Sequence, residues 1–202
     1  MYTPPLANKS DSFGCLSIDP INTVSTCVKQ MSSDDFEVLK QLGQDGAQGV
    51  VSLVEFPNGL RAAMKQFKKT KSSARIQVEA DFQQRAADAG IAPEVMHVDL
   101  DEKRIFMEPM SQRIVDVVTR GSARLSDDLT HIMKTLDSIG ILHNDGNALN
   151  LMLDYDDRLK ILDFGLAKEI NEKVRKKWQG EPNIKVTLHM LRKGLRKYKI
   201  NV

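Results

Sequence analysis

The stretch ILHNDGNALNLMLDYDDRLKILDFG, residues 141–165, decides how the rest of this sequence is interpreted. Four polar residues, His143, Asp145, Asn150 and Asp163, stand in surroundings that are mostly apolar. A carboxylate in such surroundings needs a partner, because burying it unpaired is very costly. Two carboxylates and an amide supply hard oxygen ligands, which suit Mg²⁺ bound together with substrate phosphates. Taken singly, Asp145 or Asn150 would be interpreted as a turn residue that caps its own backbone.

The elements expected around this stretch form an antiparallel sheet with one helix, followed by a helix-rich half, which is an α+β pattern. Before it, the pattern predicts three strands broken by a glycine-rich turn and by Pro57-Asn58-Gly59, a helix ended by Gly90, and two more strands. After Pro109 the chain becomes mainly helical, and a helix is expected over 126–138 with its cap at Ser126. The expected strands are 36–42, 50–54, 60–67, 95–98, 104–108, 149–153 and 159–162.

The bulk composition is that of an ordinary globular protein of 202 residues, with 41% hydrophobic and 28% charged residues. Such a length allows one compact domain or two small lobes that share a cleft. Neither a signal peptide nor an apolar run of the roughly 20 residues needed to cross a membrane is found. Cys15 and Cys27 are interpreted as free thiols of a reducing compartment, so a cytoplasmic location is predicted.

The spacing of the polar residues resembles the catalytic signature of the protein-kinase superfamily. Asn150 follows Asp145 by five residues, and Asp163-Phe164-Gly165 begins thirteen residues after Asn150. Upstream segments agree in order with that family, over about two thirds of the chain. They are the glycines Gly43, Gly46 and Gly49 followed by Val51, the strand motif Ala62-Ala63-Met64-Lys65, the acid Glu79, and Phe106-Met107-Glu108-Pro109-Met110.

The resemblance implies a bilobal fold that binds ATP and Mg²⁺ between a sheet-rich lobe and a helical lobe. It implies that Lys65, kept in place by Glu79, holds phosphates, and that Asp145 accepts the substrate hydroxyl proton. Asn150 and Asp163 would ligate Mg²⁺. Residues implied to contact the nucleotide are Gly43, Gly46, Gly49, Val51, Ala63, Lys65, Glu108, Met110 and Met152.

Several positions depart from the family pattern. Asn144 stands where regulated kinases carry an arginine, so control by activation-loop phosphorylation is not expected. Asn147 replaces a lysine that helps to neutralise the γ-phosphate in many Ser/Thr kinases. No Ala-Pro-Glu motif follows Gly165, and no acidic residue follows Glu181. The buried Asp that anchors the catalytic loop in full-length kinases is therefore expected to have no counterpart.

Residues 166–202 form a basic tail with 11 Lys or Arg against 3 Asp or Glu, in a chain of net charge +2. Leu188, Leu191, Leu195 and Tyr198 share one helical face, which predicts a helix packed on the lobe. The alternative is a docking or membrane-surface helix that contacts an acidic partner. One tryptophan among the basic residues is no strong nucleic-acid signal.

The predicted organisation is a flexible arm at 1–33, a kinase N-lobe and hinge at 34–110, and a truncated C-lobe at 111–202. This architecture is similar to that of minimal kinases, such as bacterial effector kinases of the NleH and OspG type and short kinase-like proteins of large DNA viruses. The predicted function is an ATP- and Mg²⁺-dependent Ser/Thr protein kinase that acts on a protein substrate and is either constitutively competent or controlled by an activating partner. A pseudokinase binding module and a small-molecule phosphotransferase are the alternatives.

Overall fold

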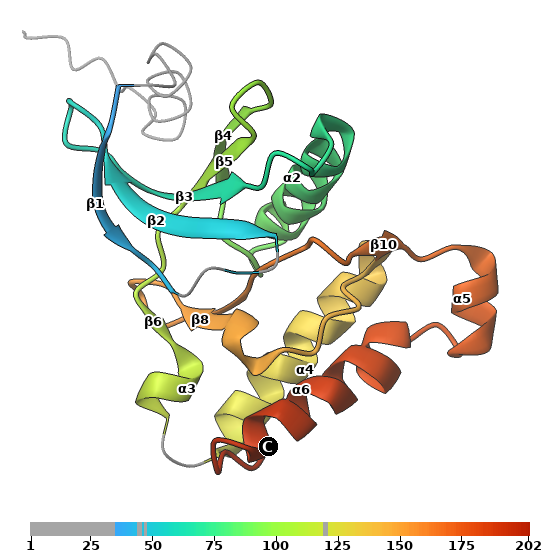
Figure 1. Cartoon of the computed structure of the whole chain (residues 1–202). Helices are drawn as coiled ribbons and strands as arrows, with labels where there is room; N and C mark the ends of the chain where they lie inside the picture. The colour runs from blue at the N-terminus through green and yellow to red at the C-terminus, as the bar shows by residue number, and fades with distance from the viewer. Residues whose placement is uncertain (1–34, 44–45, 47, 119–120) are drawn as a thin grey trace, which may run out of the picture.

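The computed structural model describes residues 35–43, 46, 48–118 and 121–202. An antiparallel sheet with one long helix forms the upper part, and a mainly helical part with two small sheets lies below it (Figure 1). This arrangement confirms the predicted α+β, kinase-like fold class. The arm expected at 1–33, with Cys15 and Cys27, lies outside the described residues.

The upper sheet has five strands in the order β1-β2-β3-β5-β4, and every neighbouring pair is antiparallel. β3 is the central strand, and its Lys65 pairs with Val51 on one side and Ile105 on the other. The turn into β3 has Gly59 at φ 81°, a conformation that suits glycine. The strands are β1 (Glu37–Gln41), β2 (Gly49–Glu55), β3 (Arg61–Phe67), β4 (Val95–Asp99) and β5 (Arg104–Met107).

One helix, α2 (Ser73–Asp88), packs beside this sheet, and its C-terminal half reaches the lower part (Figure 1). Its apolar residue Ile76 joins the cluster under the sheet, whereas Phe82 and Ala86 join the lower core. Gly90, at φ 78°, follows the end of the helix as the sequence predicted. The helix therefore connects the two cores, and Glu79 lies buried between them.

The lower part contains one long helix, α4 (Ala123–Ser138), which begins three residues earlier than predicted. Ser122, not Ser126, is the N-cap, and its Oγ accepts a hydrogen bond of 3.1 Å from Leu125 N. Leu125 is buried, so the earlier start adds an apolar contact to the core.

The remaining elements are β6 (Gln112–Arg113), α3 (Ile114–Val117), β7 (Ile141–Leu142), η1 (Ala148–Asn150), β8 (Leu151–Leu153), β9 (Leu159–Ile161), β10 (Lys168–Glu169), α5 (Glu172–Lys177), η2 (Asn183–Thr187) and α6 (Leu188–Arg196).

The C-terminal helix α6 packs into the lower core, as the apolar stripe predicted. Leu188, Leu191 and Leu195 are all buried in the same cluster as α4. The prediction for Tyr198 was wrong, because this side chain is 43% exposed. Lys199 has φ 62°, so the chain reverses after the helix and Ile200 is buried instead.

In the part of the chain that the structure describes, no helix combines the length and apolar character needed to span a bilayer.

Replacement of Leu191 by Ala tests the packing of α6. We expect the free energy of unfolding to fall by about 2–5 kcal/mol, because a fully buried side chain leaves a cavity. Urea unfolding followed by circular dichroism measures this. His189→Ala, at an exposed position of the same helix, should change stability by less than about 0.5 kcal/mol. Equal, small effects of both substitutions would show that α6 does not pack as described.

Candidate active site

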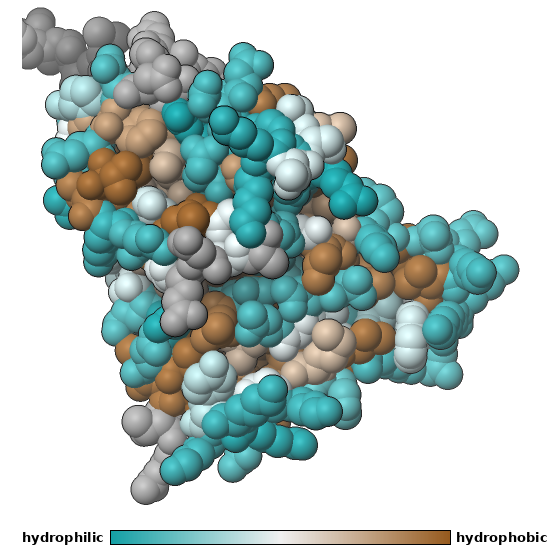
Figure 2. Space-filling model, viewed as in Figure 1, coloured by the Kyte–Doolittle hydropathy of each residue, from teal (hydrophilic) through white to brown (hydrophobic). Residues whose placement is uncertain are grey.

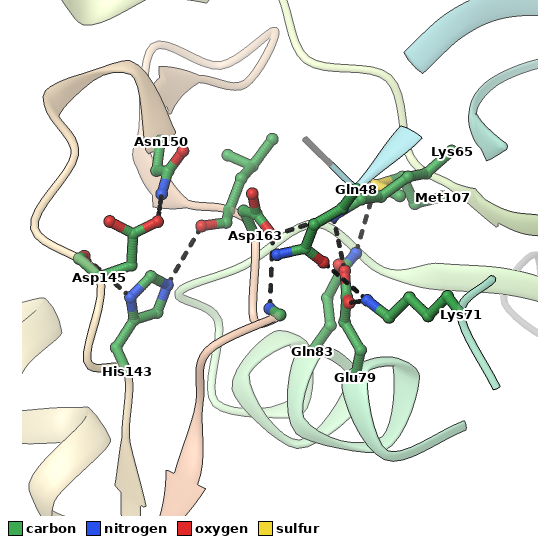
Figure 3. A network of polar contacts seen from close by, with 12 residues as sticks. Gln48, Lys65, Lys71, Glu79, Gln83, Met107, His143, Asp145, Asn150 and Asp163 are labelled. Atoms are coloured by element: carbon green, nitrogen blue, oxygen red, sulfur yellow. Dashed lines mark hydrogen bonds and ion pairs between the residues drawn. The ribbon is translucent and has the colours of Figure 1, made fainter. Parts of the chain in front are cut away.

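A buried lysine joins three segments of the chain at the boundary between the two parts (Figure 3). Lys65 Nζ lies 2.6 Å from Glu79 Oε1 on α2 and 2.9 Å from Asp163 Oδ1. Burial by itself would lower the pKa of Lys65, but the two carboxylates outweigh it and raise the pKa. The lysine therefore stays protonated, and a cation is held where the sequence placed a phosphate-binding group.

The two carboxylates that share this lysine differ in their access to solvent. The Glu79 side chain is 3% exposed, whereas that of Asp163 is 37% exposed. Burial alone would raise the pKa of Asp163. The Lys65 ammonium and a hydrogen bond of 3.3 Å from Gly165 N to Oδ1 outweigh burial, so the pKa is lowered. Asp163 is thus an ionised and accessible carboxylate, and Glu79 is an enclosed one.

A second lysine reaches the same buried carboxylate. Lys71 Nζ lies 2.5 Å from Glu79 Oε2, donates to Gln48 Oε1 at 2.7 Å, and sits 4.3 Å from the centroid of the Phe67 ring. Sequence reasoning did not single out Lys71, because Lys68 and Lys69 stand beside it and no spacing distinguishes the three. Glu79 therefore accepts hydrogen bonds from two cations rather than one.

The glycine-rich turn before β2 approaches neighbouring backbone closely at one glycine. A Cβ on Gly49 would lie 2.0 Å from Gln66 O, so a side chain does not fit there. Gly46 N donates to Gly49 O at 2.9 Å and closes the turn. Gly43 has φ 133°, a conformation that L side chains rarely adopt, and open space around it; its contact with the nucleotide stays a prediction.

Gln48, at the end of this turn, bridges to the segment at Asp163. A Cβ added to Gly165 would lie 2.6 Å from both amide atoms of Gln48. The absence of a side chain at Gly165 thus lets Gln48 reach between the turn and this segment, where it meets Lys71 (Figure 3).

The positions expected around adenine come from both parts of the molecule. Val51 and Ala63 lie on β2 and β3, and Met152 lies on β8 below the sheet (Figure 1). Glu108 N already donates to Glu94 O at 2.9 Å. An adenine edge at this hinge would therefore meet the carbonyl of Glu108 and the backbone of Met110. The roles of these residues stay predictions.

The loop between β7 and η1 carries Asp145. Its Oδ2 accepts a hydrogen bond of 2.9 Å from Asn150 Nδ2, and its Oδ1 accepts one of 3.1 Å from Asn147 N. The amide oxygen of Asn147 in turn accepts a hydrogen bond of 3.1 Å from Leu149 N and caps η1. The 3-10 turn replaces the start of the strand predicted at 149–153, because this cap satisfies the local backbone.

His143 holds this loop against the segment before Asp163. Its ring nitrogens lie 3.1 Å from the carbonyl oxygens of Asp145 and Leu162, and its ring meets Phe164 edge-on at 4.9 Å. Burial lowers the pKa of His143, although the two carbonyl oxygens favour the protonated ring. The histidine therefore lies between the loop at Asp145 and the segment at Leu162 and contacts both.

The oxygen donors fit Mg²⁺ better than a metal that needs several protein ligands. Among the described residues, no group of three His, Cys, Asp or Glu could hold a metal ion. Mg²⁺ is usually bound through one or two protein oxygens, with phosphates and water completing the shell. The carboxylate of Asp163 and the amide oxygen of Asn150 are the side chains that would hold it.

Comparison with protein-family models identifies the domain that contains this site. The model described as "Protein kinase domain" matches residues 36–185, well over half of the chain. This chain belongs to the protein kinase family. The kinase domain includes every residue of the site described above.

Two of the similar proteins bear kinase names, and a third bears the name of a tRNA-modification protein. A putative ribosomal protein S6 kinase alpha-1 of Caenorhabditis elegans is 30% identical over 83% of this chain and 23% of the relative. The mitogen-activated protein kinase spk1 of Schizosaccharomyces pombe is 25% identical over 80% and 50%. A probable bifunctional tRNA threonylcarbamoyladenosine biosynthesis protein of Methanocaldococcus jannaschii is 33% identical over 48% and 18%. The chain thus spans at most half the length of these relatives.

The expectation that the catalytic loop lacks a buried anchor after Glu181 was wrong. Asn183 Oδ1 accepts a hydrogen bond of 3.0 Å from His143 N, at the start of the loop. Asn183 Nδ2 donates to Asp137 Oδ1 and to Ile141 O, each at 2.7 Å. An amide oxygen can accept the same bond as a carboxylate, which is why the search for an acidic residue missed it.

Asp137, at the end of α4, completes this buried network. Its Oδ1 also accepts from Asn183 N at 2.9 Å, and its Oδ2 accepts from Ile184 N at 3.4 Å. Burial raises the pKa of Asp137, although these hydrogen bonds oppose the shift. The Asp137–Asn183 pair therefore ties α4, β7, η2 and the catalytic loop together in the kinase domain.

Replacement of Asn183 by Ala tests this anchor. We expect stability to fall by about 2–4 kcal/mol, because a buried carboxylate, a carbonyl and an amide all lose a partner. Hydrogen exchange at the His143 amide should accelerate markedly, which NMR or mass spectrometry would detect. Asn171→Ala removes an exposed side-chain bond to Val174 N, so it should cost about 1 kcal/mol and leave the His143 amide unchanged. Unchanged exchange at His143 in Asn183→Ala would contradict the anchoring role.

Proposed function

We propose that this kinase domain transfers the γ-phosphoryl group of ATP to a Ser or Thr hydroxyl of a protein, with Mg²⁺ as cofactor. The observation that carries this proposal is the meeting of Lys65, Glu79 and Asp163 at one site, with Asp145 and Asn150 hydrogen-bonded to each other. The kinase names of the relatives support it.

Phosphoryl transfer depends chiefly on positioning and on neutralising charge, so fixed cations and oxygens are what the protein must supply. In this proposal Lys65 binds the α- and β-phosphates, while Glu79 keeps its Nζ in place. Asp163 and Asn150 would hold Mg²⁺, which would supply positive charge to the phosphates. Lys71 adds a second cation near Glu79, in a chain that carries Asn147 where many Ser/Thr kinases have a lysine.

Asp145 is the acceptor for the proton of the substrate hydroxyl. Its hydrogen bonds to Asn150 Nδ2 and Asn147 N fix the carboxylate without placing a cation beside it. Such a carboxylate can orient a hydroxyl group and accept its proton as the new O–P bond forms. The backbone at Gly46 and Gly49 covers the phosphates.

The segment after Gly165 is held in place by contacts that need no phosphate group, which supports activity without activation-loop phosphorylation. β10 pairs with β7, and Glu169 forms an ion pair with Arg85 of α2. Arg85 also donates to Ile139 O at 2.8 Å. Asn144, in place of the family arginine, donates to Leu166 O at 3.5 Å. A protein partner that stimulates the domain is compatible with this arrangement.

Labelled ATP tests the proposal directly. The full chain is incubated with γ-labelled ATP, Mg²⁺ and a mixture of generic protein substrates, and the product is hydrolysed to identify the phosphorylated amino acid. Asp145→Asn and Lys65→Met should each lower transfer by at least about a hundredfold, because each removes a group that acts on the reacting atoms or phosphates.

Asp156→Asn serves as the control, because its side chain is 68% exposed in the turn between β8 and β9; it should retain full activity. Label on Ser or Thr that both site variants abolish is the expected result. ATP binding with no transfer to any protein, even with cell extract added, would favour a pseudokinase. Label on tyrosine would overturn the Ser/Thr assignment.

A further inference from the structure

A groove lies directly beside the catalytic loop, on the side formed by the C-terminal helix. It has a volume of about 440 Å³. One wall consists of the three residues that follow Asp145, and the other comes from α6 and the turn after it. The lining residues are Gly146, Asn147, Ala148, Met190, Lys193, Gly194, Lys197 and Tyr198.

Two glycines bring these walls together. A Cβ on Gly146 would lie 2.0 Å from Met190 Cβ, so the loop and the helix touch where no side chain fits. A Cβ on Gly194 would lie 3.4 Å from Ala148 Cβ and from Gly146 O. Gly146 therefore lets the loop approach α6 closely, while Leu188, Leu191 and Leu195 pack this helix into the core.

The charge of the groove is uniformly positive. Lys193 and Lys197 are exposed, and the lining contains no Asp or Glu. Over the described ranges, neither ammonium group forms an ion pair with a carboxylate. Figure 2 shows hydrophilic side chains gathered over the region where Figure 1 places α6.

The helix itself gives only a partial reason for these lysines. Cations near the end of a helix are favoured by its dipole. Two like charges at i and i+4, however, repel each other across one helical turn. The dipole also does not explain why both line a groove with the residues that follow Asp145, or why Met190 and Tyr198 beside them remain 39% and 43% exposed.

We propose that Lys193 and Lys197 bind an acidic side chain of the substrate, so that this domain selects a hydroxyl group within an Asp- or Glu-containing segment. This inference rests on the proposed protein kinase function. The two ammonium groups attract the carboxylate, and the exposed Met190 and Tyr198 side chains contact the apolar parts of the same segment. The groove is lined by Gly146, the residue after Asp145, and the proposal places the bound segment alongside the loop that carries the proton acceptor.

Paired peptides test the proposal with the full chain. Each pair has the same Ser-containing sequence, with Glu in one peptide and Gln in the other at positions on both sides of the Ser. We expect a kcat/KM about tenfold higher for the Glu peptide at low salt, and a smaller ratio at 0.5 M salt, because exposed charges are screened. Lys193→Ala/Lys197→Ala should reduce the ratio to near one and leave kcat/KM for the Gln peptide unchanged.

Charge reversal and a control pair sharpen the test. Lys193→Glu/Lys197→Glu should favour a peptide with Lys in place of Glu. Lys176→Ala/Lys177→Ala removes two exposed lysines of α5, outside the groove, and should keep the tenfold preference. A raised KM for ATP in the alanine double variant, without loss of peptide preference, would show that the lysines bind phosphate and would overturn the proposal.

The failure of this inference can be told apart from failure of the proposed function. Equal phosphorylation of the Glu and Gln peptides by the unmodified protein overturns the acidic-substrate proposal and leaves the kinase proposal standing. Absence of phosphate transfer to every peptide and to generic proteins overturns the kinase proposal, and with it the inference that rests on it.

Discussion

Glu79 brings a carboxylate into a region where its side chain has almost no contact with water. An unpaired charge there would be very unfavourable, so the surrounding chain must supply cations with well-placed hydrogen bonds. Lys65 and Lys71 do so from β3 and from the segment before α2. Because Lys65 also contacts Asp163, 98 positions later in the sequence, the burial of one carboxylate relates the sheet, the helix and the lower part to one another.

A second buried polar network has the same effect in the lower part. The Asn183 side chain donates a hydrogen bond to Asp137 through Nδ2, and its Oδ1 accepts a hydrogen bond from the backbone N–H of His143. Thr187 also donates to this oxygen at 3.2 Å, which places η2 in the network. Since α6 continues directly from η2, the bond that holds the catalytic loop also directs the C-terminal helix along that loop. The groove beside Asp145 is a consequence of this arrangement.

The fold class and the grouping of the main site residues could be predicted because they depend on local patterns. The order of strands, glycine-rich turn and helix can be predicted from turn residues and apolar patterns that are close together in the sequence. The polar residues of 141–165 stand out because their neighbours are apolar. Two predictions at helix ends were wrong, one at the start of α4 and one at the end of α6. Ser122 competes with Ser126 as a cap, and the buried Leu125 decides between them. Tyr198 continues the helical period, but the reversal at Lys199 gives the core position to Ile200.

The contacts that could not be predicted join residues whose own types are unremarkable. Lys71 is one of several neighbouring lysines, and only the fold brings it, rather than Lys68 or Lys69, to Glu79. Asn183 is an ordinary polar residue until its amide lies between Asp137 and His143. Gly146 and Gly194 read as turn or helix glycines, yet their function in packing is to let two backbone segments touch.

The sequence alone therefore determined the α+β kinase fold class and the set of side chains from Lys65 to Asp163, because motif order and hydrophobic period survive without knowledge of distant contacts. Only the tertiary structure decided which cations share Glu79, which amide anchors the loop at His143, and which lysines line the groove at Gly146. Those pairings depend on segments far apart in the chain. They are fixed by the requirement that buried polar groups find partners and by how closely two backbones can approach.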